Sequence, residues 1–204
     1  MSTEGKQKII EAAKNVICKN GITGATIRTI AEEAGMSTGA IYHYYKSKED
    51  ILYDVMDKSL SEASRIAEKS HSKKQSRDEL IEEIYENIAK RFNKNDENRV
   101  QFYLAQEAML GNIELTEKFK FKYKEWIDHT VELIENMYGK HDNKYNRAFA
   151  SLLIGAIDGI VMQLLLNSNI TDDEELAEVY HHILKVGIPS FMDYLDKLDH
   201  IGIM

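Results

Sequence analysis

A short segment near the N-terminus gathers side chains that suit contact with nucleic acid. Thr38 and Gly39 stand at the start of an expected helix, where small groups leave room for close approach to base edges. Tyr42 and Tyr44 follow, with hydroxyl groups at a spacing suited to phosphate oxygens. The cations of the same segment are Arg28, Lys46 and Lys48. Each residue also has an ordinary role open to it, as a core aromatic or a solvated helix end.

Two short helices joined by a tight turn must position these residues. Thr26 is placed to cap the first helix, and Gly35 follows it where a left-handed residue ends a helix. Ser37 is placed to cap the second helix, which is expected to run to about Tyr44. Over about residues 26–45 this pattern has the form of a helix-turn-helix unit that reads duplex DNA.

Residues 21–51 resemble the DNA-binding region of tetracycline-repressor-type (TetR) transcriptional regulators. The shared signature has a Thr and an Arg that open the first helix, the run Ile-Ala-x-x-Ala-Gly-x-Ser-x-Gly across the turn, and a Tyr followed by a Lys-Glu pair. Tyr45 stands where the family usually has Phe, and Ile51 where it usually has Leu; both are expected to be conservative core changes. Ala40 offers only a methyl group, so we expect sparse base readout.

The resemblance implies a DNA-binding role for residues in and around this unit. By it, Thr26 and Arg28 touch the DNA backbone and sometimes a base, Thr38 and Gly39 read the major groove, and the aromatic residues with Lys48 clamp phosphates. His43 adds an imidazole side chain to this set. The complete set of expected DNA contacts is Thr26, Arg28, Ser37, Thr38, Gly39, Tyr42, His43, Tyr44, Lys46 and Lys48.

Helical patterns continue along the chain with no strand signal, so we expect an all-α protein. The expected helices lie at about 6–20, 26–34, 37–44, from 48 onward, 78–92, 97–110, 115–138, 144–167 and 172–198, and Pro189 should break or kink the last one. Residues 68–78 hold no apolar side chain, which indicates a linker or a solvated turn. We expect a three-helix DNA-binding unit with its connector helix over 1–67, and a helical ligand-binding and dimerisation domain over 68–204.

Regulators of this type enclose a small-molecule pocket in the C-terminal helices, and residues of unusual polarity are its candidates here. Trp126 and His129 stand three apart on one helix, and Asp158 lies in the most apolar helix. Aromatic and Met side chains with a few polar anchors suit an apolar or cationic ligand. A cationic drug, a fatty acyl compound and a flavonoid-like aromatic all stay open, and ordinary core packing is the alternative role. The candidate residues are Tyr103, Gln106, Glu107, Trp126, His129, Asp158 and Met162.

The stretch 144–167 is apolar around nearly its whole circumference, so it needs cover on every side. A second copy of the chain would supply that cover, and its own domain is the alternative. We expect a buried helix and not a membrane span, because the apolar run is short and carries Asp158 and Gln163. The expected dimerisation residues are Leu152, Gly155, Gly159, Val161 and Leu165, where the glycines allow close helix approach.

Composition excludes several classes of protein. The formal net charge is −8, yet residues 1–48 hold seven Lys and Arg against four Asp and Glu. Any affinity for a polyanion would be concentrated there, and an ordinary variation in surface charge is the alternative. The single Cys18 cannot form an internal disulfide, and the N-terminus lacks the apolar core of a signal peptide, so a cytoplasmic location is expected. No Gly-rich phosphate loop, His-Glu-x-x-His or Cys-x-x-Cys pattern occurs, so we expect no catalytic residues, metal or cofactor.

Two functions fit these observations. The first, implied by the resemblance, is a homodimeric repressor that a small-molecule effector releases from a palindromic operator in double-stranded DNA. The second is a helical ligand-sensing or protein-interaction module without specific DNA binding. The salt dependence of binding separates them, because phosphate contacts weaken steeply as ionic strength rises.

Overall fold

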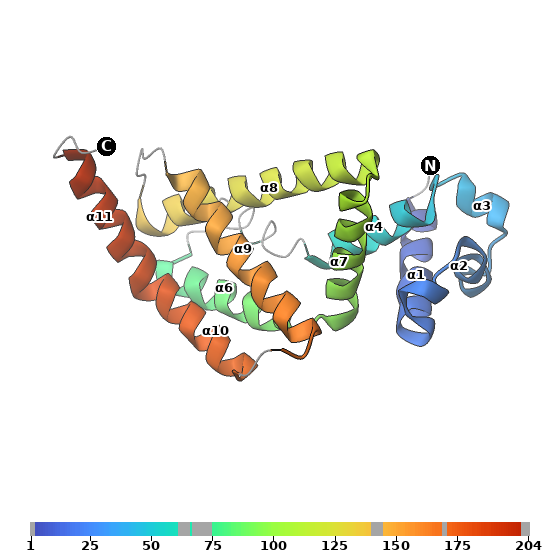
Figure 1. Cartoon of the computed structure of the whole chain (residues 1–204), viewed down its shortest axis with the longest axis horizontal. Helices are drawn as coiled ribbons and strands as arrows, with labels where there is room; N and C mark the ends of the chain where they lie inside the picture. Colours follow the sequence, from blue (N-terminus) through green and yellow to red (C-terminus); the bar gives the residue numbers. More distant parts are fainter. Residues whose placement is uncertain (1–2, 61–65, 67–74, 140–144, 169–170, 201–204) are drawn as a thin grey trace. The chain divides into compact units, whose positions relative to one another are not determined.

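The computed structural model describes residues 3–60, 66, 75–139, 145–168 and 171–200, and every regular element within those ranges is helical. Figure 1 shows their course, and the all-α prediction is confirmed. The helices are α1 (Thr3–Gly24), α2 (Ile27–Ala34), α3 (Thr38–Tyr42), α4 (Lys48–Leu60), α6 (Arg77–Phe92), α7 (Asn95–Met109), α8 (Ile113–Tyr138), α9 (Asn146–Leu165), α10 (Asp173–His182), the π-helical η1 (Ile183–Gly187) and α11 (Ile188–His200).

The first compact unit contains residues 3–60 together with 94–118. Helix α1 packs against α2 and α4, and α4 packs against α7. Branched and small apolar side chains form its core, because they recur at three- and four-residue steps on the facing sides of these helices. The members with almost no exposed surface include Ile9, Ala13, Ile30, Ile41, Ile51, Leu52, Val55, Met56, Val100 and Leu104.

Helix α7 lies in this first unit. The sequence analysis placed residues 97–110 in the second domain, because they follow the predicted boundary, and that placement is wrong. Val100 and Leu104 are fully buried, and α7 contacts both α1 and α4. The Cys18 thiol on α1 also donates to a carboxylate oxygen of Asp96 on α7, with 3.1 Å between sulfur and oxygen. The predicted boundary between residues 67 and 68 lies outside the described residues, and it stays a prediction.

Lys118, in the second turn of α8, ties the beginning of that helix to α4. Its ammonium group donates to the Asp50 carboxylate, and the Tyr53 hydroxyl donates to the Lys118 carbonyl oxygen at 3.2 Å. Burial alone would raise the pKa of the Asp50 carboxyl, but the hydrogen bond and charge of Lys118 bring the pKa below its ordinary value. Asp50 therefore carries its charge in a partly buried ion pair between the two helices.

The second compact unit contains the remaining described residues, 66, 75–93 and those from 119 onward. Helix α6 contacts both α9 and α10. A capping box opens α6, because the Glu79 N–H donates to the Ser76 hydroxyl at 3.3 Å and the Ser76 N–H donates to the Glu79 carboxylate at 2.8 Å. The Tyr180 hydroxyl on α10 donates to the Leu153 carbonyl on α9 at 3.0 Å.

Pro189 does not break the last helical stretch, contrary to one form of the prediction, because α10, η1 and α11 follow one another without a gap. The helix is instead locally π-helical at η1, which ends two residues before Pro189. Proline has no N–H, so the carbonyls of Leu184 and Lys185 cannot bond to residue 189 in π- or α-helical geometry. The Tyr138 hydroxyl donates to the Leu184 carbonyl, and the Arg77 guanidinium donates to the Lys185 carbonyl at 2.9 Å. Side chains from two other helices thus replace the missing backbone donor.

Replacing Tyr138 by Phe should destabilise the protein, because it leaves the half-buried Leu184 carbonyl without its donor. We expect Tyr138→Phe to lower the free energy of unfolding by about 1 kcal/mol, as measured by urea denaturation. Tyr42→Phe is the matched control, since Tyr42 is 58% exposed. An equal effect of the two substitutions would contradict this role for Tyr138.

Candidate nucleic-acid interface

The turn between α2 and α3 is fixed by local hydrogen bonds at both ends of α2. Thr26 and Thr29 form a capping box, in which the Thr29 N–H donates to the Thr26 hydroxyl at 3.1 Å and the Thr26 N–H donates to the Thr29 hydroxyl at 2.9 Å. Gly35 ends α2 in the left-handed region, at φ 60° and ψ 38°, and Met36 N–H donates to the Ala31 carbonyl at 2.9 Å. The caps predicted at Thr26 and Gly35 are confirmed.

Helix α3 exposes the two small residues that were expected to approach bases. Ser37 caps it, accepting a hydrogen bond from the Ala40 N–H at 3.1 Å, and Ile41 is wholly buried beneath it. Thr38 and Gly39 are both exposed. A side-chain carbon on Gly39 would meet only the Ser37 hydroxyl, at 3.8 Å, so packing within the protein does not require glycine here. The open space lies on the solvent side of α3.

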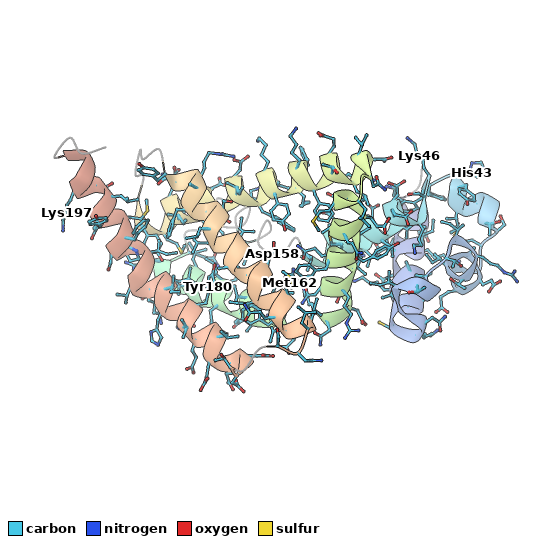
Figure 2. The ribbon with its side chains drawn as sticks, in the orientation of Figure 1. His43, Lys46, Asp158, Met162, Tyr180 and Lys197 are labelled. Carbon is cyan, nitrogen blue, oxygen red and sulfur yellow. The ribbon has the colours of Figure 1, made fainter. Side chains whose placement is uncertain are left out.

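Three further predicted contacts are exposed after these residues. Tyr42 is the last residue of α3, two residues before the predicted end, and its side chain is 58% exposed. His43 and Lys46 follow it and are also exposed. Figure 2 labels both side chains, at the end of α3 and on the turn toward α4. No ion-pair partner of Lys46 occurs within the described part of the chain, so its charge is available to an external anion.

Tyr44 and Lys48 are more enclosed than the sequence suggested. Tyr44 is half-buried, and its hydroxyl lies so close to Gly5 on α1 that a methyl group at residue 5 would overlap it. The Lys48 ammonium lies 5.1 Å from the centre of the Tyr103 ring on α7, a cation–π contact. Both side chains therefore help to hold α3 and α4 in place within the first unit.

Arg28 and Tyr45 both lie in the segment that resembles the family, but their surroundings in the structure differ. The Arg28 side chain is 84% exposed, and its guanidinium donates to Glu32 at 2.9 Å, which raises the pKa of Arg28. Tyr45 is buried, as is Ile51, and its hydroxyl donates to Asp54 at 2.8 Å. Burial first, and then this hydrogen bond, raise the pKa of Tyr45. Arg28 is thus a surface group and Tyr45 a core group.

The seven predicted effector residues do not all lie together. Those on α7, namely Tyr103, Gln106 and Glu107, belong to the first compact unit, whereas Trp126, His129, Asp158 and Met162 belong to the second. Met162 lies one turn after Asp158 on α9, where Figure 2 labels both residues. Met162 is 47% exposed. Only part of the predicted set is therefore available to one site within a single unit.

Asp158 stands in a polar cluster of the second unit that joins three helices. The Tyr123 hydroxyl on α8 donates to the Asp158 carboxylate at 2.6 Å, and the Arg91 guanidinium on α6 lies 3.6 Å from that carboxylate. The Tyr123 ring meets the Trp126 ring edge to face, with centres 5.1 Å apart. Sequence reasoning missed Arg91 and Tyr123, since Arg91 looks like an ordinary basic residue at a helix C-terminus. The three-residue step from Tyr123 to Trp126 was a usable signal.

The predicted dimerisation residues differ in exposure. Leu152 is 68% exposed, and a side-chain carbon at Gly155 or Gly159 would meet nothing within 4 Å. Leu165 is half-buried. Val161 is completely buried inside the protomer, so its side chain cannot contact a second copy as the helix stands. The expectation for Val161 is therefore corrected, because it faces the protein's own core.

Helix α9 has little cover from its own chain, which goes against the alternative that its own domain covers it, and cover by a second copy stays a prediction. Only 11% of its most apolar window is buried, and among the described helices it alone has the length and apolarity to cross a membrane. That signal is weak, because it rests on length and composition only. Further large apolar side chains that the sequence analysis did not select are also exposed in this unit: Leu166, Val179, Val186, Phe191 and Tyr194.

Comparison with known proteins matches the first unit to one family. The model of the tetR family of bacterial regulatory proteins matches residues 9–55, which span α1 to α4 and include the whole of the α2–α3 turn. This match covers the residues whose caps and exposed side chains are described above. It thus agrees with the resemblance seen in the sequence.

Relatives extend the similarity over most of the chain. The fatty acid metabolism regulator protein of Bacillus subtilis is 26% identical over 186 residues, which is 89% of this chain and 94% of that protein. The solved structure of the fatty acid degradation regulator FadR from Bacillus halodurans superimposes with a TM-score of 0.65 at 25% identity, covering 89% of this chain and 98% of that one.

The solved structure of the transcriptional regulator FadR from Bacillus subtilis, in complex with stearoyl-CoA, has a TM-score of 0.67 at 24% identity. It covers 89% of this chain and 98% of the other chain. The capped turn, the exposed face of α3 and these similarities lead to one conclusion. The chain carries, over residues 9–55, the DNA-binding region of the tetR family of bacterial regulatory proteins and is a DNA-binding transcriptional regulator.

Proposed function

We propose that this protein is a cytoplasmic homodimeric repressor that reads an inverted-repeat operator with α3 of each copy. The observation that carries the proposal is the exposed surface of α3 and the turn after it, on a helix whose opposite side is held by fully buried Ile41. Two such helices about 34 Å apart would enter successive major grooves on one side of the duplex. Inverted half-sites would then mirror the two-fold symmetry of the dimer.

The exposed residues divide into base-reading and phosphate-binding groups. Thr38 offers a hydroxyl to base edges, and Gly39 lets the helix backbone come close to them. Tyr42, His43 and Lys46 surround this point and suit phosphate oxygens. The remaining proposed backbone contacts are Thr26, Arg28, Ser37, Tyr44 and Lys48, among which Arg28 must exchange its bond with Glu32 for a phosphate.

Exposed apolar side chains on α9, α10, η1 and α11 support the homodimer. Leu152, Val179, Val186 and Tyr194 are each more than half exposed, and a soluble protomer rarely leaves so many large apolar groups in water. Gly155 and Gly159 would let two copies of α9 approach closely. A two-fold interface uses the same surface on both copies. It would therefore cover the exposed apolar side chains of these helices in both protomers.

The names of the relatives favour a fatty acyl compound as the effector. The Bacillus subtilis relative is a fatty acid metabolism regulator, and a solved FadR structure of the same fold holds stearoyl-CoA. We therefore take a long-chain fatty acyl thioester as the proposed effector. The alternative function, a sensing or interaction module without specific DNA binding, predicts that the α3 surface has no effect on DNA.

Substitutions on α3 and the following turn test the DNA-binding proposal. Lys46→Ala should weaken binding to every duplex alike and reduce the slope of log K against log salt by about one, because one phosphate contact is lost. Thr38→Ala should instead change the preference among duplexes. Fluorescence anisotropy with labelled duplexes over a salt series measures both effects.

The matched control is Lys90→Ala, which removes an exposed lysine paired with Glu86 on α6 in the second unit. DNA binding should not change in this variant. Equal binding by the wild type, Lys46→Ala and Thr38→Ala would contradict the assignment of this surface to DNA.

A charge in the apolar surface tests the homodimer. Val186→Glu should convert the dimer to a monomer in sedimentation velocity experiments, because a carboxylate would have to be desolvated between the two copies. Met109→Glu, at an 81% exposed position of the first unit, should stay dimeric. A wild-type monomer, or a dimer unaffected by Val186→Glu, would refute this interface.

A further inference from the structure

Two ring nitrogens on α8 are buried without a hydrogen-bond partner among the described residues: Trp126 Nε1 and His129 Nδ1. The Trp126 side chain is only 9% exposed, so water does not reach its N–H freely. A buried polar group without a partner lowers stability, and native proteins keep few of them. Such groups are often explained by a ligand or a water that occupies the site.

The two nitrogens lie on the same side of α8, because residues three apart on a helix are neighbours. Further aromatic rings lie next to Trp126, toward the N-terminus of α8. Tyr123 meets Trp126 edge to face at 5.1 Å, and Phe119 lies 6.3 Å from Tyr123 between ring centres. A ligand that contacts the nitrogens would therefore also meet apolar aromatic surface.

The charged groups beside this aromatic stripe, formed by Phe119, Tyr123 and Trp126, already pair with each other. Asp158 accepts a hydrogen bond from Tyr123 at 2.6 Å and lies 3.6 Å from the guanidinium of Arg91. A cationic ligand would have to displace Arg91 from Asp158, and a free carboxylate would have to compete with Asp158 for Arg91. The environment thus favours a neutral acceptor, such as a carbonyl oxygen, over a charged group.

We propose that Trp126 Nε1 and His129 Nδ1 together hold the carbonyl oxygen of a fatty acyl thioester. The indole N–H can only donate, and the neutral imidazole donates when its proton is on Nδ1. The aromatic rings of Tyr123 and Phe119 contact the adjoining acyl chain. This assignment rests on the proposed acyl effector and names the atoms that recognise it.

Direct binding of stearoyl-CoA in the absence of DNA tests this assignment. Trp126 is the only tryptophan in the chain, so intrinsic fluorescence reports on this one side chain. Stearoyl-CoA should shift the Trp126 emission of the wild-type protein, whereas CoA without an acyl chain should not. Stearate, which carries a free carboxylate, should bind more weakly than stearoyl-CoA. Calorimetry gives the Kd of variants that lack the fluorophore.

Removal of either donor should weaken stearoyl-CoA binding about tenfold, which is the usual effect of one lost hydrogen bond in a buried site. The variants are Trp126→Phe and His129→Leu. His129→Asn keeps an N–H near the place of Nδ1 and should bind within about threefold of the wild type. His129→Leu should not lower the midpoint of thermal unfolding, because its nitrogen has no partner in the effector-free protein.

Phe121→Leu and His182→Leu are the matched controls, since both side chains are exposed and neither belongs to the stripe. They should bind stearoyl-CoA like the wild type. Unchanged binding by Trp126→Phe and His129→Leu, or no binding by the wild type, would overturn the assignment. Because no DNA is present, these results are independent of whether the protein recognises an operator.

Discussion

The burial of Ile41 is the contact on which the proposed DNA-reading surface depends. Helix α3 has only five residues, and a helix so short is not stable by itself in water. Its position is set by the fully buried Ile41, by the Ser37 cap and by the left-handed turn at Gly35. Because these contacts hold one side of α3 against the protein, Thr38 and its exposed neighbours are presented in a fixed arrangement before any DNA is bound.

Helix α8 belongs to both compact units along its length. Its first residues, up to Lys118, are held to α4 by Asp50 and Tyr53 in the first unit. Its later residues carry Trp126 and His129 in the second unit. The helix proposed to contact an effector is thus the same continuous helix that is bonded to α4, the helix that follows the DNA-reading segment.

Local signals in the sequence predicted local structure well. The caps at Thr26 and Gly35 involve atoms within five residues, so residue type alone predicted them. Contacts between distant segments were not predictable in this way, as the Lys48 contact with Tyr103 and the place of α7 show. Val161 was misassigned for the same reason, because an apolar helix pattern shows which residues avoid water and not which neighbour covers each of them. The surroundings of the candidate effector residues could likewise not be predicted, since Asp158 pairs with Arg91 from another helix.

The central claim is that this protein recognises a specific duplex sequence as a dimer. Selection from a random duplex library with the full-length protein, at roughly physiological salt, tests it most directly, because specificity has no meaning without stated salt. We predict enrichment of an inverted repeat whose half-sites lie about one helical turn apart, or a multiple of it. No enrichment by a folded dimeric protein would contradict the account and favour a module that senses a ligand or binds another protein without reading DNA.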